Sequence, residues 1–467
     1  MMPRRRLGIA VAVAAAAATL PSAGFAQTRT LQDALALAYS TNPALLAERA
    51  NVRATDENVP AALSGWRPSV TISANAGQIA DTTITHEFGG NTLNNQLRGT
   101  NTEQLSVTQP VYSGGQTVAA TNKAENQVGG ERARLIAQEQ TTFGSVVQAY
   151  VNVILAQQVL ALDVNNEQVL TRQLQATNDR FRVGEITRTD VAQAESALAG
   201  ATATRQTAEG NLQTARSTYE QVVGEAPDKL VDPQPLRLPT KTLEDANTLA
   251  ANNNPSVVAA LFDDAAAKDN FDVQYSKLLP NFSVQGQLVR GKDVNELSTT
   301  TKVMEILASL SVPIYQGGIE YAAIRQARQA ELQARSNVNN ARRTAVQQAT
   351  GAWETYVAAQ ASVASTRQQI RADEIALEGV QREAIVGSRT TLDVLNAEQE
   401  LLNSRTTLVQ SLANLVDASY VMAAAVGRLT ARDLGLHVAL YDDTAYYKAV
   451  HNRWIGTGDY ATDQPAR

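Results

Sequence analysis

The chain repeats itself, and this duplication constrains its fold more than any other feature of its 467 residues. The sequence Thr-Leu-Gln-Asp-Ala at 30–34 returns as Thr-Leu-Glu-Asp-Ala at 242–246, and the Asn-Pro pair at 42–43 returns at 254–255. Both matches are 212 residues apart. Self-similarity of this kind indicates one supersecondary unit that is built more than once. We therefore expect two copies of a single structural plan.

A second set of matches has a shorter spacing of 203 residues. Pro-Val-Tyr-Ser-Gly-Gly at 110–115 matches Pro-Ile-Tyr-Gln-Gly-Gly at 313–318, and Val-Gly at 183–184 matches Val-Gly at 386–387. The extra residues of the first half therefore fall before position 110, in a stretch rich in Gly, Asn and Thr. Insertions are tolerated in loops rather than in packed elements. We predict a surface loop that is longer in the first half.

Prolines separate the two halves. Four of them fall between residues 224 and 241, a density that no helix accommodates. The sequence thus predicts a first repeat at 27–227, a proline-rich linker at 228–241 and a second repeat at 242–428. The remaining residues, 429–467, have no counterpart in the first half and are expected to form a C-terminal tail.

The N-terminus has the features of an export signal. Three arginines at 4–6 precede an apolar run at 7–20, and small residues lead up to Ala26. The apolar run is shorter than the about 20 residues that a membrane-spanning helix needs. We predict a signal peptide at 1–26, cleaved after Ala26, in preference to a membrane anchor. We also expect no later stretch to be apolar enough to cross a bilayer as a helix, so membrane insertion would use strands, as in the outer membrane.

Each half contains two segments in which apolar and polar residues alternate. These segments predict strands at about 68–77 and 104–112 in the first half, and at about 280–289 and 306–315 in the second. Alternation with a period of two gives a strand one apolar face and one polar face. A length of about 9–11 residues suits a strand that crosses the bilayer in a barrel. A soluble antiparallel sheet has the same alternation, so the strands alone leave both interpretations open.

A very long helix is predicted after each pair of strands. Residues 116–182 and 319–385 contain no proline, and each stretch has 67 residues, which corresponds to roughly 100 Å of helix. Small apolar residues, mostly alanine, recur along the second stretch at the spacing of a helix with one packed face. A coiled coil has the same local pattern. In each half, the helix before the strands and the helix after the long one roughly match the long helix in combined length. These two helices could therefore stack end to end beside it.

Each long helix is predicted to end at a Val-Gly turn. Gly184 and Gly387 supply the left-handed backbone conformation that terminates a helix. Thr189 and Thr391 can then cap the helices that return from the two turns.

One chain supplies four candidate membrane strands, which are too few to close a barrel. Small membrane barrels have about eight strands, and an open sheet edge is not viable in lipid. We therefore expect an α+β chain, mostly helical, in which strands from several copies close a ring that a ring of helices continues.

These motifs resemble those of the TolC family of outer-membrane export ducts. The resemblance spans about residues 30–435 and rests on the two Asn-Pro openings, the two Pro-(Val/Ile)-Tyr-x-Gly-Gly junctions and the two Val-Gly turns that lead to Asp-Val. It implies a homotrimer with a twelve-stranded barrel in the outer-membrane lipid and a long α-helical barrel in the periplasm. It also implies docking to a periplasmic membrane-fusion adaptor and to an inner-membrane transporter, either an ABC transporter or a proton-driven pump.

The resemblance places a gate at the periplasmic tips, where the turns at Gly184 and Gly387 lie. Asp393 matches the first acidic residue of the family's constriction, whereas Asn396 stands at the second acidic position. A trimer would therefore keep one ring of carboxylates and lose the other. We expect a weaker preference for cations than the family pattern implies.

The resemblance also assigns a latch to the tips. Arg389 matches the family's tip arginine, whose bonds hold neighbouring helices together, and Thr189 and Asp190 match its partners on the other hairpin. Ala384 replaces the family's tip tyrosine, so the latch is expected to be weaker. By spacing alone, Arg389 and Asp393 could instead form an ordinary surface pair along one helix.

The composition argues against several other classes of function. A net charge of −6 argues against a nucleic-acid partner. The chain has no cysteine, which excludes disulfides, thiolate catalysis and a lipoprotein anchor. The histidines at 86, 437 and 451 are scattered, and the Gly-Gly pairs lack the Lys-Ser/Thr of a phosphate loop. We expect no metal, no cofactor and no catalytic residue.

Three hypotheses remain for the function. The favoured one is a passive export duct for type I protein secretion, with multidrug efflux as the alternative, so the cargo is an exported protein or a small molecule. The tail from Arg428 to Trp454 resembles tails of secretion-type ducts. A trimeric coiled-coil surface protein would explain the long helices but not the paired strands. A periplasmic enzyme is the third hypothesis, and no site for one is visible.

Overall fold

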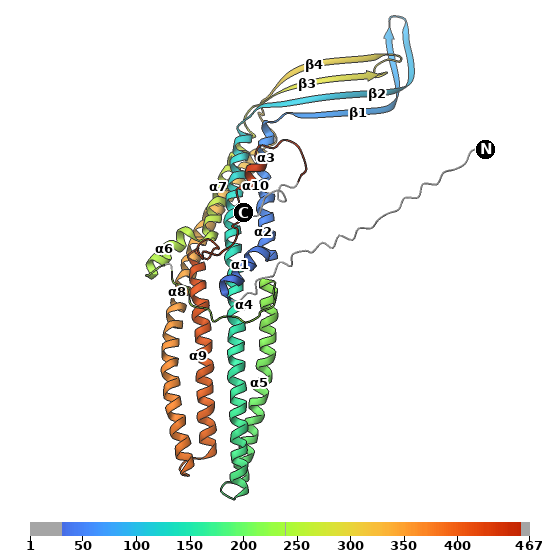
Figure 1. The fold of residues 1–467 in the computed structure, drawn as a ribbon. Coiled ribbons are helices and arrows are strands. Elements are labelled where there is room, and N and C mark those ends of the chain that lie inside the picture. Colours follow the sequence, from blue (N-terminus) through green and yellow to red (C-terminus); the bar gives the residue numbers. More distant parts are fainter. Residues whose placement is uncertain (1–29, 239, 459–467) are drawn as a thin grey trace, which may run out of the picture.

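The computed structural model describes residues 30–238 and 240–458, so the predicted signal peptide at 1–26 lies outside the described residues. The described part is elongated, with a sheet at one end and helices that run away from it to two tips at the other (Figure 1). The elements occur in the same order twice along the chain.

Each repeat consists of short helices, a pair of strands, a very long helix and a returning helix. The first repeat contains α1 (Leu31–Thr41), α2 (Pro43–Asp56), α3 (Asn58–Leu63), the 3-10 turn η1 (Ser64–Trp66), β1 (Ser69–Glu87), β2 (Gly90–Ser113), α4 (Gln116–Arg182) and α5 (Arg188–Val223). The second contains α6 (Leu243–Asn253), α7 (Pro255–Ser276), β3 (Asn281–Lys292), β4 (Thr300–Ser311), α8 (Ile319–Ile385) and α9 (Thr391–Ala425), and the tail adds α10 (Ala445–Val450).

The two long helices form the frame of the molecule. α4 and α8 have 67 residues each, and their bounds coincide with the two proline-free stretches of sequence. Shorter helices cover each of them: α4 packs against α2 near the sheet and against α5 toward the tip, and α8 packs against α7 and then α9 (Figure 1). α7 and α9 also contact α4, so this second pair of shorter helices lies between the two long ones.

In the first repeat, the asparagine of the Asn-Pro pair holds two helix ends together. Asn42 Oδ1 accepts the backbone N–H of Ala44 at 3.0 Å and thereby caps α2. Its Nδ2 donates to the carbonyl of Val222, near the end of α5, at 3.0 Å. The first backbone N–H groups and the last carbonyls of a helix have no partner within that helix. One side chain therefore satisfies a free group on each of two helices and fixes their end-to-end contact.

The second repeat has the same joint, and it is more deeply buried. Asn254 Oδ1 accepts the N–H of Ser256 at 2.9 Å and caps α7, and its Nδ2 donates to the carbonyl of Ala425, the last residue of α9, at 3.1 Å. Gly427 follows with a φ of 78°. A Cβ at Gly427 would lie 2.5 Å from the carbonyl oxygen of Asn253, so only glycine fits this contact.

The largest hydrophobic core lies around the middle of α4. Phe143, Val147 and Tyr150 are fully buried there, packed with α1, α5 and the start of the tail. The hydroxyl of Tyr150 donates to the carbonyl of Val231 at 2.7 Å and so ties the proline-rich linker to this core.

The sequence analysis predicted that no stretch after the signal peptide is apolar enough to cross a bilayer as a helix, and this prediction was wrong for α4. The helix contains an 18-residue window with a mean hydropathy of 1.5, which is long and apolar enough to cross a membrane by length and composition. Apolar side chains in the middle of α4 face the protein interior, because α1, α5 and the tail cover them. A buried core helix and a membrane span therefore share the same apolar signature here.

The four strands form one antiparallel sheet in the order β1-β2-β3-β4. One row of the sheet joins Ile72, Leu105, Leu288 and Met304, each opposite the next. Since side chains alternate along a strand, this register places the apolar residues of all four strands on one face. β1 and β4 form the two edges of the sheet.

The first pair of strands is longer than the sequence predicts. β1 and β2 have 19 and 24 residues, so they extend beyond 68–77 and 104–112. Residues 78–103, expected to form a loop, instead continue the ladder up to a turn at Phe88 and Gly89. The residues inserted in this hairpin pair with those of the opposite strand and so lengthen the ladder. The many threonines of this stretch also favour strand structure. The prediction of a longer surface loop was wrong for this reason.

The second pair of strands differs from the prediction mainly at its ends. β3 and β4 have 12 residues each, against the predicted 280–289 and 306–315. β4 ends at Ser311 because Pro313 has no backbone N–H to donate to the ladder.

The tail folds back along the first repeat toward the base of the sheet (Figure 1). Leu429 and Val450 are fully buried along this path. Arg132 of α4 lies 3.7 Å from Asp56 of α2 and 3.7 Å from Asp443 of the tail. Burial raises the pKa of Asp56 to about 6, because the loss of hydration outweighs the attraction of the Arg132 guanidinium. Buried polar contacts as well as apolar packing therefore hold the tail.

The joint of the second repeat leads to a first prediction. Substitution Asn254→Ala removes the cap of α7 and leaves the buried carbonyl of Ala425 without a donor. We expect the free energy of unfolding to fall by about 1–3 kcal/mol, measured by thermal and urea denaturation of the purified full chain. Asn252→Ala, at an exposed position two residues away, is the matched control and should have little effect. Equal stability of the two variants would contradict the role of this joint.

Candidate functional site

The two helical hairpins end in exposed turns of the same construction. Gly184 has a φ of 81° and Gly387 a φ of 80°. In the first turn the N–H of Glu185 donates to the carbonyl of Arg180 at 3.0 Å, and in the second the N–H of Ser388 donates to the carbonyl of Glu383 at 3.0 Å. These bonds close the helix ends in the manner that a left-handed glycine allows. Both turns therefore have a defined shape although they are exposed to solvent.

A reciprocal cap starts each returning helix. Thr390 Oγ1 accepts the N–H of Asp393 at 3.2 Å, and the Asp393 carboxylate accepts the N–H of Thr390 at 2.9 Å. Thr187 and Asp190 form the same pair in the first hairpin, with the corresponding distances 3.4 and 3.0 Å. Threonine followed by an acid three residues later is the sequence signature of such a capping box.

The capping residues differ from the predicted ones. The sequence analysis placed the caps at Thr189 and Thr391, whereas Thr187 and Thr390 occupy the capping positions. Thr189 is an exposed residue of the first turn of α5, and Thr391 is the first residue of α9. The prediction overlooked the three-residue spacing between each capping threonine and its aspartate.

The caps lower the pKa of the two acidic residues that the sequence analysis assigned to a gate, Asp393 and Asp190. The hydrogen bond from the N–H of Thr390 lowers the pKa of Asp393, with further contributions from the Thr390 hydroxyl and from Arg389. The hydrogen bonds from Thr187 likewise lower the pKa of Asp190. A lowered pKa means that both carboxylates are ionised at neutral and mildly acidic pH.

Each tip also carries an ion pair, and the two pairs have opposite polarity. In the first hairpin Arg180 Nε lies 3.1 Å from a carboxylate oxygen of Glu185, and in the second Arg389 Nε lies 2.9 Å from a carboxylate oxygen of Glu383. Arg180 and Glu383 are equivalent positions, because they are 203 residues apart. The helix end therefore supplies the positive member of the pair in the first hairpin and the negative member in the second. The bond to Glu383 also raises the pKa of Arg389. The sequence analysis did not single out Arg180, Glu185 or Glu383, although the repeat alignment pairs Arg180 with Glu383.

The structure brings together only some of the predicted gate residues. Arg389 binds Glu383 of its own hairpin rather than Asp393, so the surface pair that spacing alone suggested is not the principal contact. Asp393 binds Thr390. Asn396 is exposed, one helical turn beyond Asp393 on α9. Within the single chain, Arg389 therefore makes its ion pair inside its own hairpin.

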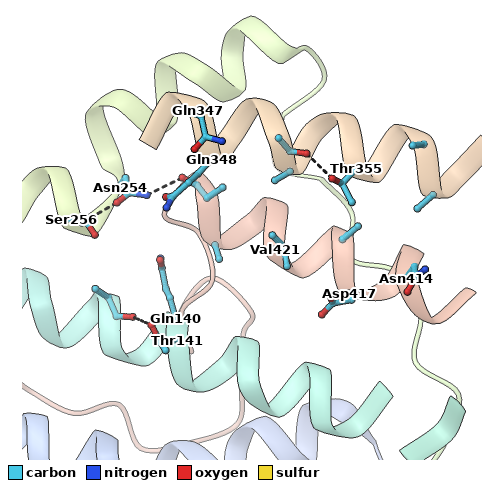
Figure 2. Close-up of a pocket in the computed structure, with 18 of the residues that line it drawn as sticks. Gln140, Thr141, Asn254, Ser256, Gln347, Gln348, Thr355, Asn414, Asp417 and Val421 are labelled. Atoms are coloured by element: carbon cyan, nitrogen blue, oxygen red, sulfur yellow. Dashed lines mark hydrogen bonds between the residues drawn. The ribbon is translucent and has the colours of Figure 1, made fainter. Parts of the chain in front are cut away.

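A cavity of about 990 Å³ lies at the joint of the second repeat, between α4, α7, α8 and α9 (Figure 2). Amide and hydroxyl side chains such as Gln140, Gln347, Thr355 and Asn414 line it. Among the described residues that line it, only Asp417 is ionisable, and burial raises the pKa of its carboxyl. Ligand pockets are usually apolar with a few convergent polar groups, whereas about half of this lining consists of amide and hydroxyl side chains and the rest mostly of alanine. We assign the cavity to the joint rather than to a ligand.

Residues 30–238 and 240–458 contain no cluster of three or more His, Asp or Glu side chains that could hold a metal ion. The ionisable groups at the tips pair with one another or with helix ends. This arrangement supplies charge and defined backbone shape at an exposed end of the molecule, and it supplies no nucleophile with an activating base.

The capping boxes lead to a second prediction. Thr390→Val removes the hydroxyl that accepts from the Asp393 N–H, whereas Thr391→Val changes the neighbouring threonine in the same way and leaves the cap intact. Loss of such a cap costs about 1 kcal/mol, so the backbone amides at the start of α9 should exchange hydrogen roughly five-fold faster in Thr390→Val. Hydrogen exchange followed by mass spectrometry measures this rate. Faster exchange in Thr391→Val instead would place the cap at the predicted position.

Comparison with known proteins identifies both repeats. The family model described as "Outer membrane efflux protein" matches residues 34–225 and 248–428. The outer membrane efflux protein BepC of Brucella suis is 37% identical over 436 residues, which cover 92% of each of the two chains. The alkaline protease secretion protein AprF of Pseudomonas aeruginosa is 23% identical over 344 residues, which cover 72% of this chain and 71% of AprF.

Solved structures share the fold. The outer membrane protein VceC of Vibrio cholerae superposes with a TM-score of 0.72 at 18% sequence identity, over 85% of this chain and 96% of VceC. The family match over both repeats, together with this fold, sets aside a trimeric coiled-coil surface protein and a periplasmic enzyme.

Two matched repeats, a four-stranded sheet with one apolar face and two long helical hairpins agree with the resemblance in the sequence. The chain belongs to the outer membrane efflux protein family, which includes the TolC-type ducts, and it is a passive channel of the outer membrane rather than an enzyme.

Proposed function

We propose that three copies of this chain form the exit duct of a tripartite export system. The observation that carries the proposal is the open sheet, whose edges β1 and β4 have no partner strand within the described chain. An unpaired edge is not viable in the hydrocarbon region of a bilayer. Three copies joined β4 to β1 give a closed ring of twelve strands, which falls within the range of membrane barrels.

The helices support the same arrangement. Toward the tips, α4 lies between α5 and α9, and α9 lies between α4 and α8, so α5 and α8 are the outer members of the layer. α8 has eight buried residues against 21 in α4, although both helices have 67 residues. α8 is therefore the frame helix with the larger uncovered surface. In a ring, α8 of one copy would pack against α5 of the next and cover it.

The tips would form the periplasmic gate of this duct. In a trimer, three Asp393 carboxylates approach one another at the constriction, and Asn396 adds no second ring of charge. Arg389 would exchange its bond to Glu383 for Thr189 and Asp190 of an adjacent hairpin in the closed state. Such an exchange between two similar exposed ion pairs involves a small difference in free energy, so the latch would open readily.

The partners follow from the same proposal. A periplasmic membrane-fusion adaptor would bind the helical hairpins, and an inner-membrane ABC transporter would supply the energy, since channels of this family are passive conduits. A proton-driven pump is the alternative energy source.

The cargo divides the proposal into two candidates. We favour type I protein secretion, because AprF carries protease secretion in its name and the tail resembles those of secretion-type ducts. Multidrug efflux is the second candidate, and the name of BepC, which is more similar in sequence, favours it.

The charge of the gate leads to a third prediction. Asp393→Asn removes the carboxylate ring but keeps an oxygen that can accept the cap hydrogen bond. An interaction of about 1 kcal/mol between a passing ion and the ring corresponds to a roughly five-fold change in the cation-to-anion permeability ratio. We expect the ratio to fall by about that factor in single-channel recordings, at pH 7 and also at pH 5, since the pKa of Asp393 is lowered.

Asn396→Asp is the matched variant with the opposite expected effect. It would restore a second acidic ring and raise the permeability ratio for cations. Unchanged ion selectivity in both variants would exclude this part of α9 as the constriction.

The choice of cargo leads to a fourth prediction. Deletion of the gene should remove specific polypeptides from the culture medium while the accumulation of hydrophobic dyes stays near the level of the parent strain. The secreted proteins are compared by mass spectrometry, and dye uptake by fluorescence. Normal secretion with raised dye accumulation would assign the duct to efflux instead.

A further inference from the structure

The end of the tail lies at the base of the membrane sheet. Beyond α10, which is placed beside α3 directly below the sheet (Figure 1), the chain reaches Arg67. Arg67 Nη1 donates to the carbonyl of Arg453 at 2.5 Å, and the Arg67 guanidinium lies over the ring of Trp454, 5.2 Å from its centroid. Arg67 is two residues before Ser69, where β1 begins. These contacts fix Trp454 close to the level at which the strand starts.

The apolar side chains of the tail change from buried to exposed at this point. Its earlier apolar residues are covered, since Leu429 and Val450 are fully buried. Trp454 and Ile455 are 65% and 88% exposed, respectively. The chain thus holds two large apolar side chains in solvent-accessible positions immediately after a well-packed segment. Ordering exposed apolar side chains in water gains no hydrophobic free energy, so their position suggests an apolar environment outside the chain.

Other aromatic side chains mark the same level. Trp66 precedes β1 and is 40% exposed, Tyr112 lies near the end of β2 and is 46% exposed, and Tyr315 follows β4 and is 76% exposed. Tryptophan and tyrosine are enriched where a protein crosses from hydrocarbon to headgroups, because their rings are apolar and their N–H or O–H groups are polar. In membrane barrels these residues form girdles at both ends of the apolar band.

We propose that Trp454 and Ile455 bind the periplasmic leaflet of the outer membrane, so that the tail adds an anchor from outside the strands to the aromatic girdle. The indole lies among the phospholipid headgroups, and Ile455 reaches toward the acyl chains. Arg67 and Arg453 lie beside them, where guanidinium groups can bind lipid phosphates. The partner is a phospholipid surface, recognised by an apolar pair flanked by positive charge.

This anchor would couple the helical part of the molecule to the bilayer. The tail is tied to α4 through Arg132 and Asp443, and to the base of β1 through Arg67. A lipid contact at Trp454 therefore holds the junction of sheet and helices at a fixed depth. The inference rests on the outer-membrane location of the chain and is independent of the cargo.

Tryptophan fluorescence tests the proposal directly, because the chain has only three tryptophans, at 66, 353 and 454. A variant with Trp66→Phe and Trp353→Phe retains Trp454 alone. The purified full chain is reconstituted into vesicles of phosphatidylethanolamine and phosphatidylglycerol that contain a phospholipid with a spin label on its headgroup. We expect at least two-fold quenching of Trp454 by this lipid, and weaker quenching by a lipid labelled near the end of its acyl chain.

Two further variants control the measurement. The variant that retains only Trp353 should be unaffected by either lipid, since residue 353 is 34 residues along α8 from its sheet end, roughly 50 Å away. The variant that retains only Trp66 should be quenched, because Trp66 lies three residues before the start of β1, and its quenching shows that the sheet is inserted. Quenching of Trp66 without quenching of Trp454 would overturn the proposal. Shielding of Trp454 from aqueous iodide in that case would indicate that a second copy of the chain covers it.

Discussion

The two long helices, α4 and α8, have 67 residues each and need packing partners along their whole length. In each repeat, a single asparagine joins two shorter helices end to end, and together these cover the long helix. The returning helices α5 and α9 have only 36 and 35 residues. A second helix must therefore continue the contact toward the sheet, and two helix ends meet beside the frame. Such a meeting leaves unpaired N–H groups on one side and unpaired carbonyls on the other. Asn42 and Asn254 satisfy both, and the proline that follows each of them fits the first turn of the next helix.

The rest of the architecture depends on these joints. They place α5 and α9 in line with the helices that lead to the strands, so each repeat becomes one layer that extends from the sheet to the tip (Figure 1). The two layers then bring β2 next to β3 and form one sheet from both repeats. Because the apolar face runs across all four strands, the sheet can face lipid as a unit. The same order leaves edges at β1 and β4, which links the packing within one chain to assembly with others.

Much of this fold could be predicted because the signals are local or are repeated. Proline-free stretches gave the bounds of α4 and α8, and alternation gave the apolar face of the sheet. The extension of β1 and β2 was missed because its threonines and asparagines resemble loop sequence, and only pairing with the opposite strand makes them a ladder. The apolar window of α4 was overlooked, and its burial depends on the tail and on α1, which are distant in sequence.

The tips show where prediction from sequence reaches its limit. The turns at Gly184 and Gly387 follow from glycine chemistry, but the partner of Arg389 depends on which acid the turn brings near it. In one chain that acid is Glu383, and its counterpart in the first hairpin is Arg180. Neighbouring tips thus present ion pairs of opposite polarity, an arrangement that favours attraction between unlike hairpins when they meet in a ring.

The four-stranded sheet of a single chain has two open edges, which other copies of the chain would have to close. Native mass spectrometry of the full chain, extracted from the outer membrane in mild detergent, measures this most directly. We expect a complex of three copies, in which the twelve strands close without a free edge. A folded monomer, or a dimer with eight strands, would contradict it.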